Sequence, residues 1–236
     1  VNAIELAMLE PISTFRISIG KTANFTLLIP YLEFEVPFWY SQVLNYAISL
    51  TIPLLIVGIM MNLSCLSIVS EGPLPRMLVT PTTKREIILS KLIANIAIMV
   101  LQSTEIFISL ALFGLYSLGS LFDLYLTMLL LGLSGVSIGL FISSISKTEQ
   151  VANQLFIMFF IIVLMFSGSF FSVESLPFFM QIIVNSLPLT HGINLVVDIT
   201  LKGLPINLYR VLNLLLISIV FLIVTYIIYS FKKLEV

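Results

Sequence analysis

Residues 71–86 read EGPLPRMLVTPTTKRE, a short polar stretch that separates two long apolar runs. Residues 36–70, before it, contain no Asp, Glu, Lys or Arg, and residues 87–122, after it, contain only Lys91 and Glu105 as charged side chains. A glycine and several prolines favour turns within the stretch. The pattern predicts two membrane helices joined by an aqueous segment, and this segment is where we expect the protein to meet a partner.

The composition of the whole chain extends this prediction to a polytopic protein. Hydrophobic residues make up 59% of the 236, charged residues 10%, and the mean hydropathy is +1.14. A soluble domain is about 45–50% apolar and about a quarter charged. A bilayer core needs roughly 20 apolar residues per helix, and several runs reach that length. Strands of a membrane barrel would appear as segments of about ten residues in which apolar and polar residues alternate. The apolar runs here are continuous instead. We therefore expect an all-α transmembrane helical bundle.

Five spans are expected, with a broken apolar stretch before the last one. The spans are residues 41–69, 86–115, 124–146, 151–166 and 211–231. Residues 174–205 are cut by three prolines, which favours two short helices that dip into one leaflet or lie at the interface. Residues 1–36 are mixed in character and predict an extracytoplasmic or interfacial segment, so residues 37–236 form the expected transmembrane domain. Trp39 and Tyr40 lie at the start of this domain, and their amphipathic rings suit the headgroup level of a membrane.

Two patterns inside the predicted spans indicate helix packing. Gly135 and Gly139 have the spacing of small residues that lets a neighbouring helix approach closely. Phe156, Phe159 and Phe160 share one helix face, which supports a packing interface more than a ligand site.

The polar residues in apolar surroundings leave alternatives open. Glu105 lies mid-span, where an acid normally faces a bundle interior or a wet cavity, and it could form a substrate or proton site or an interhelical hydrogen bond. His191 could act as a pH-dependent gate, although a hydrogen-bonded structural role is more common for such a lone histidine. Asp123 is expected to mark the membrane boundary at the start of its helix.

Several function classes lack the residues they need. Cys65 is the only cysteine and His191 the only histidine, so no disulfide framework or paired-histidine metal site is expected. The net charge is −1, with no basic face for nucleic acid. A phosphate-cradling Gly-x-x-x-x-Gly-Lys-Ser/Thr loop is absent from the sequence, so we expect this chain to bind no cofactor and not to hydrolyse ATP itself.

The basic residues predict the orientation in the membrane. With residues 71–86 in the cytoplasm, that side holds seven of them and the other side four, in keeping with the positive-inside rule. Five spans then place the N-terminus outside and the C-terminus inside a plasma membrane. No signal-peptide pattern is present, and Val1 in place of Met fits either a fragment or an unusual start.

Several stretches across residues 40–231 resemble the membrane subunit of a type-2 ATP-binding-cassette exporter. Glu71-Gly72, Met77-Leu78-Val79-Thr80-Pro81 and Glu86-Ile87-Ile88-Leu89-Ser90-Lys91 resemble the family's charged cytoplasmic stretch. Further similar stretches are Gly139–Ser143 with Lys147–Gln150, Ser167-Gly168 with Phe171, Glu174 and Leu176-Pro177, and Leu187–His191. Each stretch is weak alone, and their shared order and spacing make the set specific.

The resemblance implies which residues contact a partner. A coupling element would dock on a separate nucleotide-binding ATPase subunit, which would hold ATP and Mg²⁺. The residues implied in it are Glu71, Gly72, Leu74, Arg76, Met77, Leu78, Thr80, Pro81, Arg85, Glu86, Lys147 and Glu149. Glu105, Glu174 and His191 are the candidates for a pathway or gate. A second permease copy, identical or related, and the lipid bilayer are the other expected partners.

Two departures from the family pattern are visible. The family has six spans and this sequence shows five, so the first span is missing from it. Pro73 and Pro75 stand where the family has helix-forming residues, although proline fits only the first turn of a helix.

The function that the resemblance implies is export of a lipophilic or amphipathic substrate, such as a drug, a lipid or a glycan. A secondary transporter or channel that uses Glu105 as an ion site, and a non-transporting assembly protein derived from a permease, are the alternatives.

Overall fold

The chain divides into two compact units, residues 1–35 and 36–236. The computed structural model describes residues 42–70, 84–112, 117–167 and 177–231, all of which belong to the second unit. These residues form helices and short connections. The helices are α2 (Gln42–Leu66), α4 (Lys84–Leu112), α5 (Leu121–Ile145), α6 (Glu149–Met165), α7 (Phe178–Asn185), α8 (Pro188–Thr200) and α9 (Leu208–Phe231).

Each predicted span corresponds to one helix, and the broken stretch corresponds to α7 and α8. The observed helices α5 and α6 begin a few residues earlier than predicted, because polar residues that look like loop in the sequence form the helix starts. Ser120 caps α5 by accepting a hydrogen bond from the Asp123 N–H at 3.5 Å, and Thr148 caps α6 in the same way. Asp123 and Glu149 then lie in the first turns, where a negative charge is favourable.

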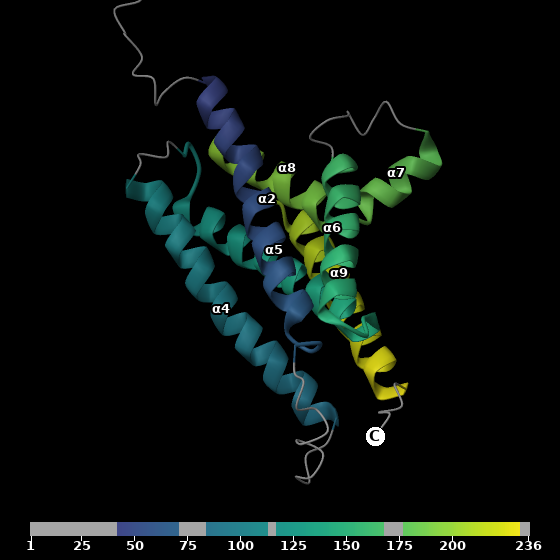
Figure 1. The fold of residues 1–236 in the computed structure, drawn as a ribbon. Coiled ribbons are helices and arrows are strands. Elements are labelled where there is room, and N and C mark those ends of the chain that lie inside the picture. Colours follow the sequence, from purple (N-terminus) through teal and green to yellow (C-terminus); the bar gives the residue numbers. More distant parts are fainter. Residues whose placement is uncertain (1–41, 71–83, 113–116, 168–176, 232–236) are drawn as a thin grey trace, which may run out of the picture. The chain divides into compact units, whose positions relative to one another are not determined.

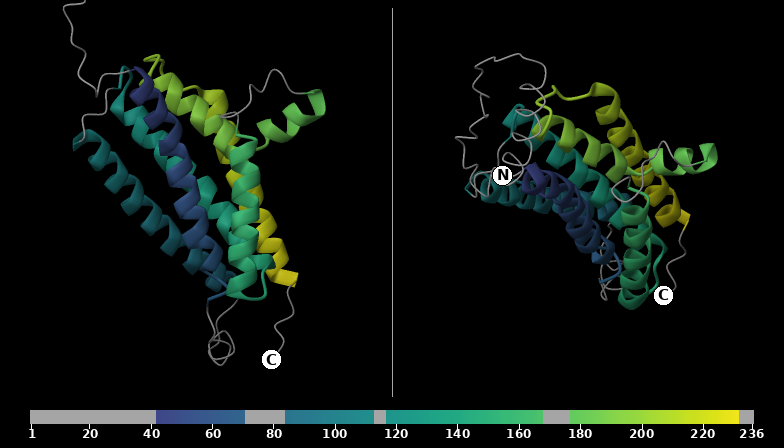
Figure 2. Two further views of the ribbon diagram at one scale, coloured as in Figure 1. Left: turned by 45° about the horizontal axis from the view of Figure 1, so that its top comes forward. Right: turned by 90° about the horizontal axis from the view of Figure 1, so that it is seen from above.

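Four helices, α2, α4, α5 and α9, are long and apolar enough to cross a membrane. The helices α7 and α8 meet at an angle of 77° and count as at most one further span. Helix α6 has 17 residues, so it extends about 25 Å against a hydrocarbon core of about 30 Å. It nevertheless runs back along α2 (Figures 1 and 2). The Phe160 ring of α6 lies against Gly58 of α2.

Helix α5 lies at the centre of the bundle. It contacts α2, α4, α6, α8 and α9. In the apolar stretch of 18 residues that could cross the membrane, 72% of the residues of α5 are buried. In the corresponding stretch of α9, 17% of the residues are buried. Figure 1 shows α4 on one side of α2 and the pair α6 and α9 on the other, with α7 extending away from the bundle. The core therefore forms around α5, and α4 and α9 leave one face each uncovered.

Two glycines explain how closely α5 and α2 approach each other. A Cβ atom on Gly135 would lie 2.9 Å from the Val57 carbonyl oxygen, and one on Gly139 would lie 2.6 Å from the Met61 carbonyl oxygen. Real side chains do not tolerate such distances to a backbone atom. The predicted role of this glycine pair in helix packing is confirmed.

The bundle has two distinct ends, which the following sections call the loop end and the far end. At the loop end, α2 finishes and α4 starts, and a buried cluster contains Ile68, Ile87 and Tyr229. At the far end, the Ser49 hydroxyl of α2 lies 2.7 Å from the Thr200 hydroxyl of α8. The Leu118 N–H, just before α5, donates to the Thr200 carbonyl oxygen at 3.0 Å.

The glycine contact predicts an asymmetric response to two alanine substitutions. Gly139→Ala places its methyl group against the α2 backbone and should destabilise the bundle by about 1–3 kcal/mol. Gly58→Ala meets only the edge of the Phe160 ring, at 3.0 Å, and that side chain can move. Thermal unfolding in detergent should show a lower midpoint for Gly139→Ala than for Gly58→Ala, and equal midpoints would contradict the packing role.

Candidate functional site

The structure describes only a few of the residues predicted to contact an ATPase. Residues 71–83, which include Glu71, Gly72, Leu74, Arg76, Met77, Leu78, Thr80 and Pro81, lie outside the described residues, as does the side chain of Arg85. Glu86 lies in the first turn of α4 and is exposed. Lys147 and Glu149 are exposed at the junction of α5 and α6, at the loop end. These three side chains are therefore accessible to a partner.

Polar contacts at the loop end hold the chain that leads into residues 71–83. The buried hydroxyl of Ser143, on α5, accepts hydrogen bonds from the N–H groups of Ile68 at 3.0 Å and Val69 at 3.2 Å. These N–H groups lie just beyond the end of α2. One hydroxyl on the central helix therefore fixes the exit of the chain from α2.

Asn95 of α4 makes a second set of polar contacts to the same part of the chain. Its carbonyl oxygen accepts from the Ser64 hydroxyl at 3.2 Å, and its amide donates to the Ser67 hydroxyl at 2.9 Å. Asn95 is only 3% exposed, so these bonds form in a region that excludes water. The end of α2 is therefore tied to α4 as well as to α5.

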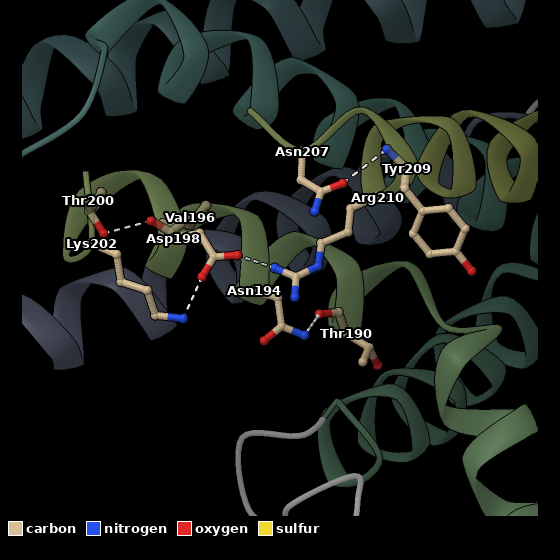
Figure 3. Close-up of polar contacts among 9 residues, drawn as sticks. All are labelled: Thr190, Asn194, Val196, Asp198, Thr200, Lys202, Asn207, Tyr209 and Arg210. Atoms are coloured by element: carbon tan, nitrogen blue, oxygen red, sulfur yellow. Dashed lines mark hydrogen bonds and ion pairs between the residues drawn. The ribbon is translucent and has the colours of Figure 1, made fainter. Parts of the chain in front are cut away.

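The far end contains a cluster of charges around Asp198 (Figure 3). The Asp198 carboxylate of α8 accepts a hydrogen bond from Lys202 at 2.6 Å and pairs with Arg210 at the start of α9. The side chain of Asp198 is 12% exposed and that of Lys202 is 59% exposed. The ion pair with Arg210 thus joins α8 to α9, whereas Lys202 reaches the aspartate from the surface.

A groove of about 640 Å³ lies beside this cluster. It is lined by residues of α7, α8 and α9 and the connection between α7 and α8, namely Asn185, Ser186, Thr190, His191, Asn194, Tyr209, Arg210, Asn213, Leu216, Ile217, Val220 and Phe221. His191 is 7% exposed, and its Nε2 atom lies 2.8 Å from the Asn185 carbonyl oxygen. The hydrogen bond agrees with the structural role considered for His191, which also borders the groove, whereas its role as a gate stays a prediction.

The two acidic residues predicted for a pathway are not brought to this groove. Glu105 lies on the exposed side of α4, among exposed apolar side chains such as Leu101 and Ile108, and has no partner among the described residues. Glu174 lies outside the described residues. No group of three His, Cys, Asp or Glu side chains in the described part of the chain is placed to hold a metal ion.

The described helices include four that are long and apolar enough to cross a membrane. A profile of the ABC-2 type transporter family matches residues 8–201. The chain belongs to this ABC-2 family. It is accordingly a multi-pass membrane protein with the domain of a permease. The profile takes in part of the 1–36 segment and ends before α9.

Curated relatives of this ABC-2 chain carry transporter names. One is the probable multidrug ABC transporter permease YbhR of Escherichia coli K12, 30% identical over 184 residues, which is 75% of this chain and 50% of the relative. Another is ABC transporter G family member 20 of Dictyostelium discoideum, 28% identical over 138 residues, or 58% of this chain and 19% of that protein. The chain thus spans about half the length of the first relative and less of the second.

Several residues that join helices in this ABC-2 domain are not among those that the sequence singled out. Asp198, Lys202 and Arg210 were visible as charges in an apolar stretch, and the separation of four residues between Asp198 and Lys202 suits a pair on one helix. The contacts of Asn95 and Ser143 join residues from different helices, and nothing in the sequence alone indicates their partners.

The Ser143 contacts predict faster amide exchange at the end of α2. Ser143→Ala leaves the Ile68 and Val69 N–H groups without their acceptor, at a cost of about 1–3 kcal/mol. Hydrogen exchange of a peptide covering residues 67–70 should accelerate about tenfold or more. Ser137→Ala is the control, because the Ser137 hydroxyl is equally buried and bonds only to Ser134 of its own helix. Unchanged exchange in Ser143→Ala would contradict this role.

The charge cluster predicts a strong coupling between Asp198 and Arg210 and a weak one between Asp198 and Lys202. Each pair can be measured in a double-mutant cycle with Asp198→Asn combined with Arg210→Gln or with Lys202→Gln. The first cycle should give a coupling on the order of 1–3 kcal/mol, and the second below about 1 kcal/mol because Lys202 is exposed. Unfolding in detergent supplies the free energies, and the reverse order of couplings would refute the assignment.

Proposed function

We propose that this chain is the transmembrane permease subunit of an ATP-driven ABC exporter. The match of the ABC-2 profile over residues 8–201 carries the proposal. The name of the Escherichia coli relative, a probable multidrug ABC transporter permease, supports export of a lipophilic or amphipathic substrate. A separate nucleotide-binding subunit would hold ATP and Mg²⁺ and perform the hydrolysis. Two such permease domains, from identical or related chains, would form the pathway.

The partner ATPase would act on the loop end of the bundle. Residues 71–83 join the end of α2 to the start of α4, and Lys147 and Glu149 are exposed at the same end. A displacement of residues 71–83 would pass to α5 through the bonds to Ser143 and to α4 through Asn95. ATP can drive transport only if its binding favours one arrangement of these helices over the other.

The same scheme gives an orientation in the plasma membrane. The ATPase is placed in the cytoplasm, so the loop end and the C-terminal end of α9 would face the cytoplasm. The far end, with the groove beside Arg210, would face the outside. The excess of basic residues on the loop-end side agrees with this orientation.

Substitutions in residues 71–83 test the proposed contact with the ATPase. Replacing both Met77 and Leu78 by Asp should abolish co-purification of an ATPase subunit from native membranes in mild detergent, since charged side chains would be placed in an apolar docking surface. Replacing Thr82 and Thr83 by Asp is the matched control, because it adds the same charge to polar positions of the same segment. Expression and thermal stability of both variants should equal those of the unmodified protein.

The outcomes separate the proposal from its alternatives. Loss of the ATPase only in the Met77 and Leu78 variant supports both the partner and the contact. If both variants retain the ATPase equally, residues 71–83 do not form the contact with it. If the purified protein never contains an ATPase and moves substrate in response to a pH gradient alone, the protein is a secondary transporter and the proposal is wrong.

A further inference from the structure

The groove at the far end changes character along α9. Arg210 and Asn213 line it near the start of the helix, and Ile217, Val220 and Phe221 line it further on. These residues recur at separations of three and four, so they share one face of the helix. From Arg210 to Val220 the helix rises about 15 Å, which is about half of the hydrocarbon core of a bilayer. The groove is therefore polar near Arg210 and apolar further along α9, and the two parts together extend over about the depth of one leaflet.

The polar part of the groove offers hydrogen-bond donors that the protein itself leaves unused. A guanidinium group carries five N–H donors, and the contact of Arg210 with Asp198 involves one of its nitrogens. The half-buried amide of Asn213 has no hydrogen-bond partner among the described residues. The Asn194 amide donates to the Thr190 carbonyl oxygen, which leaves its own oxygen as an acceptor. Arg210 and Asn213 therefore supply unused donors to this part of the groove, and Asn194 supplies an acceptor.

Among the residues that line the groove, Arg210 carries a positive charge and none is acidic, which favours an anion. In the described parts of α7, α8, α9 and their connections, the charged side chains are Asp198, Lys202 and Arg210, two basic and one acidic. The planar arginine fork matches the oxygens of a phosphate group better than a point charge does. Tyr209, which also lines the groove, has the amphipathic ring that is enriched at the headgroup level of membranes.

We propose that the groove between α8 and α9 binds an amphiphile with a phosphate headgroup, such as a membrane phospholipid. The phosphate contacts Arg210 and Asn213, and the acyl chain lies along Ile217, Val220 and Phe221. The site belongs to this chain alone and requires neither ATP nor the ATPase, so its test is independent of the proposed transport function.

Lipid binding to the purified full chain in mild detergent tests this site, with native mass spectrometry as the readout. Three probes separate the parts of the ligand: dioleoylphosphatidylglycerol, dioleoylglycerol, which has the chains without the phosphate, and glycerol phosphate, which has the phosphate without the chains. We expect the phospholipid to bind at least about tenfold more tightly than either of the others. A preference for dioleoylglycerol or for free glycerol phosphate would overturn the proposal.

Variants of α9 locate the binding. Val220→Trp fills the apolar part of the groove, and Asn213→Leu removes the free amide. Each should weaken phospholipid binding about tenfold. Ile219→Trp is the control, because Ile219 is the neighbouring residue, is 52% exposed against 47% for Val220, and does not line the groove. Thermal unfolding in the same detergent verifies that all three variants fold. Equal binding by Val220→Trp and Ile219→Trp would place the lipid elsewhere and refute the proposal.

Discussion

The direct contact between the backbones of α2 and α5 is the constraint on which the rest of the bundle depends. In a bilayer, helices gain no hydrophobic free energy by leaving lipid for one another, so close packing and polar contacts must hold them together. Gly135 and Gly139 provide the close packing by leaving room for the carbonyl groups of α2. Once α5 is fixed against α2, its remaining faces are available to α4, α8 and α9.

The polar contacts lie at the two ends of this packed core. Ser143 and Asn95 hold the loop end, and the Asp198–Arg210 pair holds the far end. Between these ends the described helices are held mainly by packing, with the Thr104 hydroxyl of α4 lying 2.9 Å from the Tyr125 hydroxyl of α5. A rocking motion could therefore keep the central α2–α5 contact while the ends change partners, because hydrogen bonds can exchange more easily than interlocked backbones can slide.

The sequence was informative about the helices and much less so about their contacts. Apolar runs indicate the positions and approximate lengths of the helices because the bilayer sets the length of a span, and the glycine spacing indicated a close helix contact. The start of α5 was placed too late because Ser120 and Asp123 resemble loop residues until the cap is seen. The bonds of Ser143 and the groove beside Arg210 depend on which helices are neighbours, and no pattern within one helix contains that information.

Unequal helix length has a consequence for the surrounding lipid. Helix α4 extends about 43 Å and must tilt to keep its apolar surface within the hydrocarbon layer, whereas α6 extends about 25 Å. A short helix is accommodated by local thinning of the bilayer, at a modest cost for each ångström of mismatch. If α6 spans the bilayer, the membrane is expected to adjust unevenly around the protein, and sterol-rich or long-chain lipids would then penalise the α6 side first.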